Sequence, residues 1–188
     1  MEKIRAYFER AVNLSDEDWK VFSAGLKQRE FPKKTQLTQT GDTENYLSYL
    51  EKGVVRFYIP QIENDIAFGF VFEGSWVSAY DSFLTRTPAK YNIECLTDCT
   101  LWSISYEDIQ IAYANTRVGE KIGRVACEEL FLKKAKRELS LLNSTAEQRY
   151  LKLLTEQQHL VQQIPLKFLA SYIGVTPQAL SRIRKRIS

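Results

Sequence analysis

The sequence predicts a mixed α+β fold: a jelly-roll of short strands, then one long helix, then a helix-turn-helix near the C-terminus. From about residue 30 to 105, short runs of β-branched and aromatic residues alternate with turn signals. From about residue 116 to 142, apolar residues recur at helical spacing. After residue 165, a small residue, a glycine and a capping threonine follow at the spacing of a helix-turn-helix. We therefore expect three parts, at residues 1–115, 116–143 and 144–188.

The first of these parts begins with helix and continues as strands. Ser15 is a suitable N-cap for a helix with an acidic first turn. Further along, glycines at positions 41, 53 and 74 mark turns between β-rich runs. Closely spaced short strands of this kind are typical of a β-sandwich or a jelly-roll barrel. The expected strands are Tyr46–Leu50, Val54–Ile59, Ile66–Phe72, Tyr91–Leu96 and Thr100–Ser105.

The second part is expected to be a single rod of helix about 40 Å long. Its apolar positions repeat with a period near 3.5 residues, which is the spacing of a coiled coil. A small barrel cannot cover such a rod, so the pattern favours a homodimer; packing of the helix along its own barrel is the alternative. The residues expected to face the partner are Val118, Ile122, Val125, Leu132 and Leu139.

The third part carries the most specific motif of the chain. A helix-turn-helix needs a small residue where its helices nearly touch, and Ala170 supplies one. Gly174, four positions later, suits a turn residue with positive φ. Thr176 can cap the second helix and Pro177 suits its first position. A generic helical hairpin with a basic end is the alternative, but it does not require this placement of alanine and glycine.

The charge distribution points to a polyanion bound at the C-terminal end. Residues 146–188 contain seven basic and two acidic side chains, although the whole chain carries only +3. The exposed face of the second helix should enter the major groove of double-stranded DNA. Glutamine and arginine there suit base edges, whereas serine and the remaining basic residues suit phosphates. The expected DNA-binding residues are Thr176, Gln178, Ser181, Arg182, Arg184, Lys185 and Arg186.

Catalysis and metal binding are not expected. A single histidine, His159, excludes multi-histidine metal sites, and no glycine-rich phosphate loop is present. Cys95 and Cys99 are expected in one strand, about 13 Å apart, and we expect all three cysteines, including Cys127, to be small buried residues rather than metal ligands. We therefore expect no enzyme activity, no metal and no cofactor. No apolar run reaches the ~20 residues that cross a bilayer, so we expect a cytoplasmic protein without a membrane partner.

The order of these parts resembles the Crp/Fnr family, whose members include the cyclic-AMP receptor protein. That resemblance covers nearly the whole chain and rests mainly on the turn at Gly53 and on the terminal motif. It implies a cyclic-nucleotide-binding-like jelly-roll, a dimerisation helix and a DNA-binding helix-turn-helix. The implied function is a homodimeric, sequence-specific transcription regulator. The supporting segments are Gly41-Asp42, Leu50–Arg56, Phe72–Val77 and Leu101–Tyr106.

This sequence departs from the family at the nucleotide cassette. Nucleotide-binding members carry Gly-Glu and Arg-Ser or Arg-Thr pairs, and the corresponding residues here are Ser78, Ala79, Ala89 and Lys90. Since the glutamate and the arginine are missing, we expect a degenerate effector pocket and no control by cyclic AMP, leaving the small-molecule effector unknown. The alternative function is a small-molecule-binding jelly-roll module whose basic tail docks RNA or a protein partner.

Overall fold

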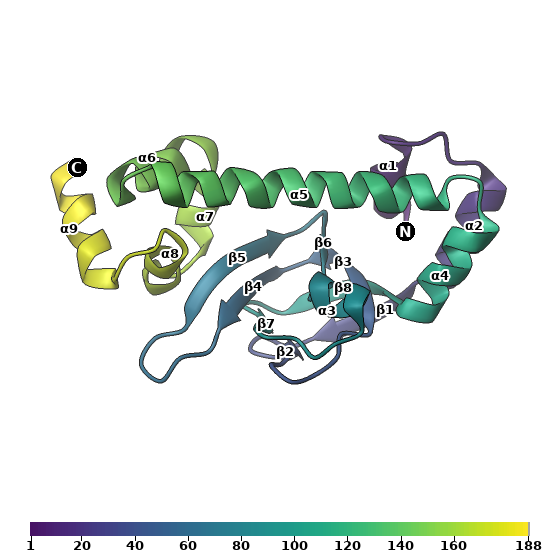
Figure 1. Ribbon diagram of the computed structural model, residues 1–188, viewed down its shortest axis with the longest axis horizontal. Helices are drawn as coiled ribbons and strands as arrows, with labels where there is room; N and C mark the ends of the chain where they lie inside the picture. The colour runs from purple at the N-terminus through teal and green to yellow at the C-terminus, as the bar shows by residue number, and fades with distance from the viewer. Residues whose placement is uncertain (188) are drawn as a thin grey trace. The chain divides into compact units, whose positions relative to one another are not determined.

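The computed structural model describes residues 1–187 (Figure 1). Two helices open the chain, and eight strands with one inserted helix follow in the described residues. The bounds are α1 (Glu2–Glu9), α2 (Asp16–Ala24), β1 (Lys27–Phe31), β2 (Gln36–Thr38), β3 (Tyr46–Lys52), β4 (Val54–Ile59), β5 (Ile66–Phe72), β6 (Ser75–Val77), α3 (Tyr80–Thr85), β7 (Asn92–Cys95) and β8 (Cys99–Ser105).

Helices make up the remainder of the described chain. The longest is α5, of 25 residues, and the final pair flanks a short turn. The bounds are α4 (Tyr106–Asn115), α5 (Gly119–Asn143), α6 (Ala146–Glu156), α7 (Gln158–Gln163), α8 (Leu166–Tyr172) and α9 (Pro177–Ile187).

The strands form two four-stranded sheets, with orders β1-β8-β3-β6 and β2-β7-β4-β5. Their jelly-roll arrangement confirms the expected fold class, and the five expected strands correspond to β3, β4, β5, β7 and β8. Three further strands were not expected. In β1, Lys-Gln-Arg-Glu-Phe has too few apolar residues to read as a strand, yet it pairs along its length with β8.

Apolar side chains from both sheets meet in a buried core that includes Leu50, Val55, Ile93 and Leu101. The chain turns at Gly53 between β3 and β4, which lie in different sheets, and the φ of Gly53 is +107°. A side chain there would also meet the Asp98 carbonyl oxygen at 2.6 Å, so only glycine fits. The turn therefore has both a conformational and a steric requirement for glycine.

A second buried cluster joins the N-terminal helices to the start of α5. Ile4 and Phe8 of α1 and Phe22 of α2 pack with Ile104 of β8 and Ile122 of α5. Ser15 caps α2 by accepting a hydrogen bond from the Asp18 backbone N–H at 3.1 Å, as its sequence position predicts. The N-terminal helices thus extend the core of the jelly-roll.

The long helix begins later than expected. Residues 116–118 form a bend, and α5 begins at Gly119, where an added side chain would meet the Cα of Tyr113 at 2.7 Å. This close approach fixes the bend between α4 and α5. Val118 therefore precedes the helix instead of lying in its first turn.

The prediction that Cys95 and Cys99 lie far apart in one strand was wrong. Cys95 ends β7 and Cys99 begins β8, and the turn between the strands brings the two thiols within hydrogen-bonding reach. The hydrogen bond between the two thiols lowers the pKa of Cys99 and raises that of Cys95. Both side chains are buried, as expected, but the same expectation for Cys127 was wrong, because Cys127 is exposed on α5.

The chain divides into two compact units. The first comprises Met1–Phe57 and Phe70–Glu129, and the second comprises Tyr58–Gly69 with the chain from Leu130 onward. Inside the second unit, the Ala67 backbone N–H donates to the Ser171 hydroxyl at 2.7 Å. The tip of the β4–β5 hairpin therefore belongs with the C-terminal helices.

Candidate nucleic-acid interface

The last two helices, α8 and α9, are joined by the turn Ile173–Thr176. Gly174 has a φ of +77°, in the left-handed region that favours glycine. Within the turn, the Val175 backbone N–H donates to the Ala170 carbonyl at 3.0 Å. The Thr176 hydroxyl accepts from the Ala179 backbone N–H at 3.2 Å, so it caps α9 as expected. The local chemistry predicted from the sequence is therefore present.

A small apolar core holds these two helices at their turn. Ala170 is 0% exposed, which agrees with the need for a small residue between the helices. Val175, in the turn between the two helices, is only partly buried. The buried side chains of α8, α9 and the turn are Leu169, Ala170, Ile173, Leu180 and Ile183.

Two arginines brace the turn from neighbouring helices. Arg149 of α6 donates through Nε to the Ile173 carbonyl at 2.8 Å and also reaches the Ser144 carbonyl. Arg137 of α5 donates to the Tyr172 carbonyl at 3.0 Å, and its guanidinium carbon lies 4.8 Å from the Tyr172 ring centroid. These bonds satisfy carbonyls at the end of α8, which a helix leaves without partners. Neither role was predicted, because each depends on tertiary contacts.

The polar face of α9 is exposed. Of the seven residues expected to bind DNA, Arg186 also makes an ion pair with Glu147 of α6. Leu180 and Ile183 mark the buried side of α9. The polar side chains on the opposite side face solvent and lie three or four residues apart, as neighbours on one helix face do. The seven residues, all exposed, are Thr176, Gln178, Ser181, Arg182, Arg184, Lys185 and Arg186.

The residues expected to face a dimer partner fall into two groups. Ile122 is 5% exposed and packs inside its own chain, so its assignment to a partner-facing stripe was wrong. Val118 packs against the same cluster and lies outside α5, and Val125 is half-buried. In contrast, Leu132 and Leu139 are 66% and 57% exposed.

Two exposed apolar residues of α5 were not expected from the sequence. Phe131 and Leu142 are 70% and 74% exposed, and they extend the apolar face of Leu132 and Leu139. Leu142 lies three residues after Leu139, so continuing the predicted repeat by one step would have found it. Lys136, which lies between Leu132 and Leu139 in this repeat, pairs with Glu156 at 3.2 Å.

The four residues of the expected degenerate effector pocket are not brought together around one cavity. Ser78 lines a cavity in the first unit, and the other three residues are not part of the lining of that cavity. Ala79 and Ala89 are buried in the apolar core between the sheets, and Lys90 is exposed. The small side chains thus fill core positions instead of forming a phosphate site.

The described residues contain no cluster of three or more histidine, cysteine or acidic side chains arranged to hold a metal. Over that same part of the chain, none of the helices combines the length and the apolar character needed to cross a bilayer.

A comparison with protein families gives a match within the first part of the chain. Residues 28–116 match the family model of the cyclic nucleotide-binding domain. None of the curated proteins matches the sequence.

Solved structures extend the likeness to the C-terminal helices. The c-di-GMP-responsive global regulator CLP of Xanthomonas campestris is 19% identical, with a TM-score of 0.69 and coverage of 92% of this chain and 91% of that chain. FixK2 from Bradyrhizobium japonicum is 16% identical, with a TM-score of 0.71 and coverage of 86% and 84%.

A third structure, assigned to the Crp/Fnr family of transcriptional regulators, comes from Eubacterium rectale. It is 18% identical, with a TM-score of 0.71 and coverage of 93% and 83%. At such identities, the likeness is one of fold. Residues 28–116 thus match the cyclic nucleotide-binding domain, and the chain has, over most of its length, the fold of these solved Crp/Fnr-like structures.

Proposed function

We propose that this protein is a sequence-specific, double-stranded DNA-binding transcription regulator. The observation that carries the proposal is the exposed polar face of α9, built on a capped helix-turn-helix with a buried core. A recognition helix needs an apolar side that fixes it to its domain and a free polar side that enters the major groove. Helix α9 has both.

Two roles are assigned on that face. Gln178 and Arg182 lie one helical turn apart near the start of α9, where recognition helices contact base edges. Glutamine pairs bidentately with adenine and arginine with guanine. Ser181, Arg184 and Lys185 would bind phosphates, which position the protein without reading sequence.

Arg186 is expected to contact a phosphate only if its present ion pair breaks. Its guanidinium already pairs with Glu147 of α6, so a phosphate contact would compete with that ion pair. Both side chains are substantially exposed, and an exposed pair of this kind contributes only about 0–1 kcal/mol. A phosphate could therefore replace Glu147 at little cost.

We also propose that the protein acts as a homodimer through the exposed apolar face of α5. Burying one large apolar side chain contributes about 1.5–3 kcal/mol, and Phe131, Leu132, Leu139 and Leu142 are each more than half exposed in a single copy. A two-fold partner would cover this face on both copies at once and would bring two recognition helices to an inverted repeat. This interface omits Ile122, since it is buried in its own chain.

Control by cyclic AMP is not part of the proposed function. The positions where nucleotide-binding relatives carry glutamate and arginine are Ala79 and Ala89, and both are buried alanines. Neither alanine side chain can hydrogen-bond to a ribose hydroxyl or pair with a phosphate. The chain keeps the domain but lacks these two anchors.

The test is selection of bound sites from random DNA duplexes at a fixed salt concentration, followed by affinity measurement on the selected and a scrambled duplex. We expect an inverted repeat and at least about a thousandfold preference over the scrambled duplex. Equal affinity for all duplexes would contradict the proposal. In that case, binding to RNA or to a protein partner would become the better reading of the basic tail.

A further inference from the structure

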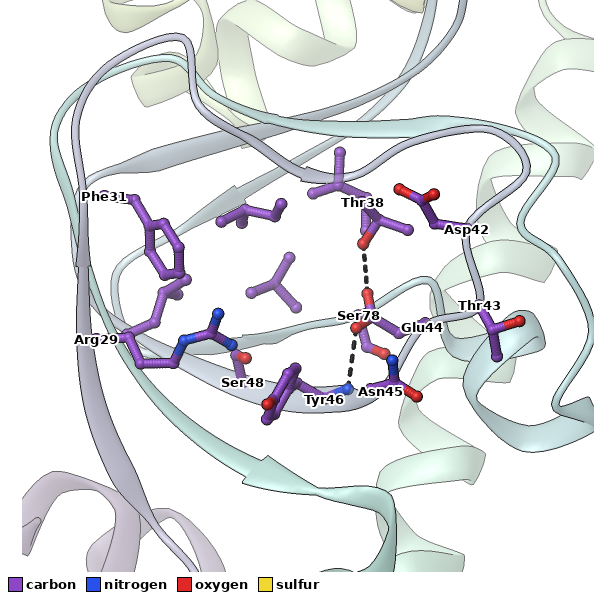
Figure 2. A pocket seen from close by; sticks show the side chains of 14 residues that line it. Arg29, Phe31, Thr38, Asp42, Thr43, Glu44, Asn45, Tyr46, Ser48 and Ser78 are labelled. Carbon is purple, nitrogen blue, oxygen red and sulfur yellow. Dashed lines mark hydrogen bonds between the residues drawn. The ribbon is translucent and has the colours of Figure 1, made fainter.

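A cavity of about 410 Å³ opens inside the first unit, beside β1 and the loop before β3 (Figure 2). Its volume lies in the ~300–1,000 Å³ range of small-molecule sites. The lining combines aliphatic and polar side chains. Its aliphatic residues are Leu37, Val77, Ile93 and Leu101.

Arg29 is the cation of this cavity. It pairs with Leu101 in the β1–β8 ladder, so its side chain leaves β1 on the same face as the buried Leu101 side chain. Its guanidinium carbon lies 4.9 Å from the Phe31 ring centroid and 4.4 Å from that of Tyr46. The rings hold the guanidinium in place but accept none of its in-plane hydrogen bonds. Figure 2 shows the guanidinium beside Ser48, directed into the cavity.

No acidic side chain of the described residues forms an ion pair with Arg29. The carboxylate of Glu44, which also lines the cavity, accepts hydrogen bonds from other donors. It accepts from the Thr38 hydroxyl at 2.5 Å and from the backbone N–H groups of Tyr46 at 2.9 Å and Ala79 at 3.3 Å. A planar, positioned guanidinium without a carboxylate partner is suited to bidentate binding of an external anion.

Ser78 supplies a second, independent observation. Ser78 is one of the residues that line the same cavity, and its buried hydroxyl oxygen has no hydrogen-bond partner among the described residues. The other buried hydroxyls of the lining are paired, Ser48 with Ser103 at 2.8 Å and Thr38 with Glu44 at 2.5 Å. A buried polar group without a partner is costly in free energy, so such groups are uncommon unless a ligand or a water satisfies them.

The surroundings select the charge of the anion. Asp42 and Glu44 lie on the wall of the cavity, and Figure 2 shows both away from the Arg29 end. Two carboxylates disfavour a doubly charged phosphate more than a singly charged carboxylate. The aliphatic lining residues favour a ligand whose remaining part is apolar.

We propose that this cavity binds a small organic monocarboxylate with an apolar body, whose carboxylate pairs with Arg29 and whose second polar group reaches Ser78. The site differs from a cyclic nucleotide cassette, because neither Ala89 nor Lys90 lines the cavity. Its anchor lies instead on β1. The proposal does not depend on DNA binding.

The experiment measures thermal stabilisation and calorimetric affinity of the full chain with three probes: 4-hydroxyphenylacetate, indole-3-acetate and 4-methyl-2-oxopentanoate. Each is compared with its own amide, which has nearly the same shape but no charge. We expect at least one acid to raise the melting temperature with concentration, and its amide to bind at least about tenfold more weakly. Failure of all three acids to bind, or equal affinity of acid and amide, would overturn the proposal.

Variants then locate the site. Arg29→Gln should weaken the bound acid by at least about tenfold, whereas Lys27→Gln should leave affinity unchanged, since Lys27 is an exposed cation of the same strand outside the cavity lining. Ser78→Ala should weaken it about threefold to tenfold. An unchanged affinity in Arg29→Gln would overturn the assignment of the anchor. The acid–amide comparison uses only the native chain, so it decides the charge requirement even if Arg29→Gln folds poorly.

Discussion

The carboxylate of Asp18 in α2 accepts a hydrogen bond of 2.9 Å from the backbone N–H of Arg117, in the bend that leads into α5. The Ser15 hydroxyl donates to the same carboxylate at 3.0 Å. This buried side chain therefore ties the N-terminal helices to the start of the long helix. The hydrogen bond from Arg117, aided by that from Ser15, lowers the pKa of Asp18.

A lowered pKa in the folded state predicts acid sensitivity. The stability contributed by Asp18 is present above its unfolded pKa of about 3.9 and is lost as the pH falls through the lower folded value. Asp18→Asn should thus be less stable than the native chain at pH 7, with a gap that narrows below about pH 4. Urea unfolding across this range measures it. Glu17→Gln, which removes an exposed acid of the same helical turn, is the control; an equal, pH-independent loss in Asp18→Asn would contradict the prediction.

Arg182→Ala should weaken binding to the selected DNA site by about 1–3 kcal/mol and relax the preference at one base pair. Lys185→Ala should instead weaken all duplexes similarly and reduce the salt dependence by about one phosphate contact. Binding isotherms on single-base variants of the site, at several salt concentrations, separate the two behaviours. Unchanged base preference in Arg182→Ala would remove that residue from sequence readout.

Cyclic AMP should neither raise the melting temperature nor change DNA affinity, because Ala79 and Ala89 replace the two residues that anchor the nucleotide in relatives. Thermal unfolding with increasing cyclic AMP tests this, with AMP as the matched control. A rise seen only with cyclic AMP would show that other residues perform the anchoring.

Leu132→Glu should convert a dimer into a monomer and abolish tight binding to an inverted repeat. The glutamate would place a charge in the apolar face that the proposed partner covers. Lys134→Glu, at an exposed polar position two residues away, is the control and should remain dimeric. Light scattering at micromolar concentration gives the mass, and a monomeric native chain would contradict the proposed interface.

Gly174→Ala should destabilise the C-terminal unit by about 1–2 kcal/mol, the cost of a left-handed conformation for a residue with a side chain. An added Cβ would meet its nearest neighbours at 3.7 Å, which is ordinary contact, so the loss comes from the backbone. Gly174→Asn should lose less, because asparagine tolerates this conformation better. Chemical unfolding ranks the three proteins; equal stability of alanine and glycine would exclude strain at this turn.

Local chemistry explains why the C-terminal motif was predictable from sequence. Ala170, Gly174 and Thr176 act through helix contact, positive φ and capping, and each requirement is met within a few residues of the chain. Strands β3, β4 and β5 were found for a similar reason, since glycine turns at Gly53 and Gly74 mark one end of each.

Tertiary contacts explain what the sequence did not reveal. Ile122 and Leu132 occupy the same kind of position in a 3.5-residue repeat, but only one is covered by its own chain. A repeat shows that a residue is apolar and leaves open which surface covers it. Arg29 was missed because its place in a cavity depends on the register between β1 and β8.

The hydrogen bond between Ala67 and Ser171 has a consequence for dissecting the protein. Helix α8 is bonded to the tip of a hairpin more than a hundred positions earlier in the chain, so the C-terminal unit is not contiguous in sequence. A fragment that starts at Leu130 would contain α8 and α9 but would leave the Ser171 hydroxyl without its bond to Ala67. A shortened chain that joins Tyr58–Gly69 through a linker to the segment from Leu130 onward would keep this bond, and it is the smaller part of the protein to test for DNA binding.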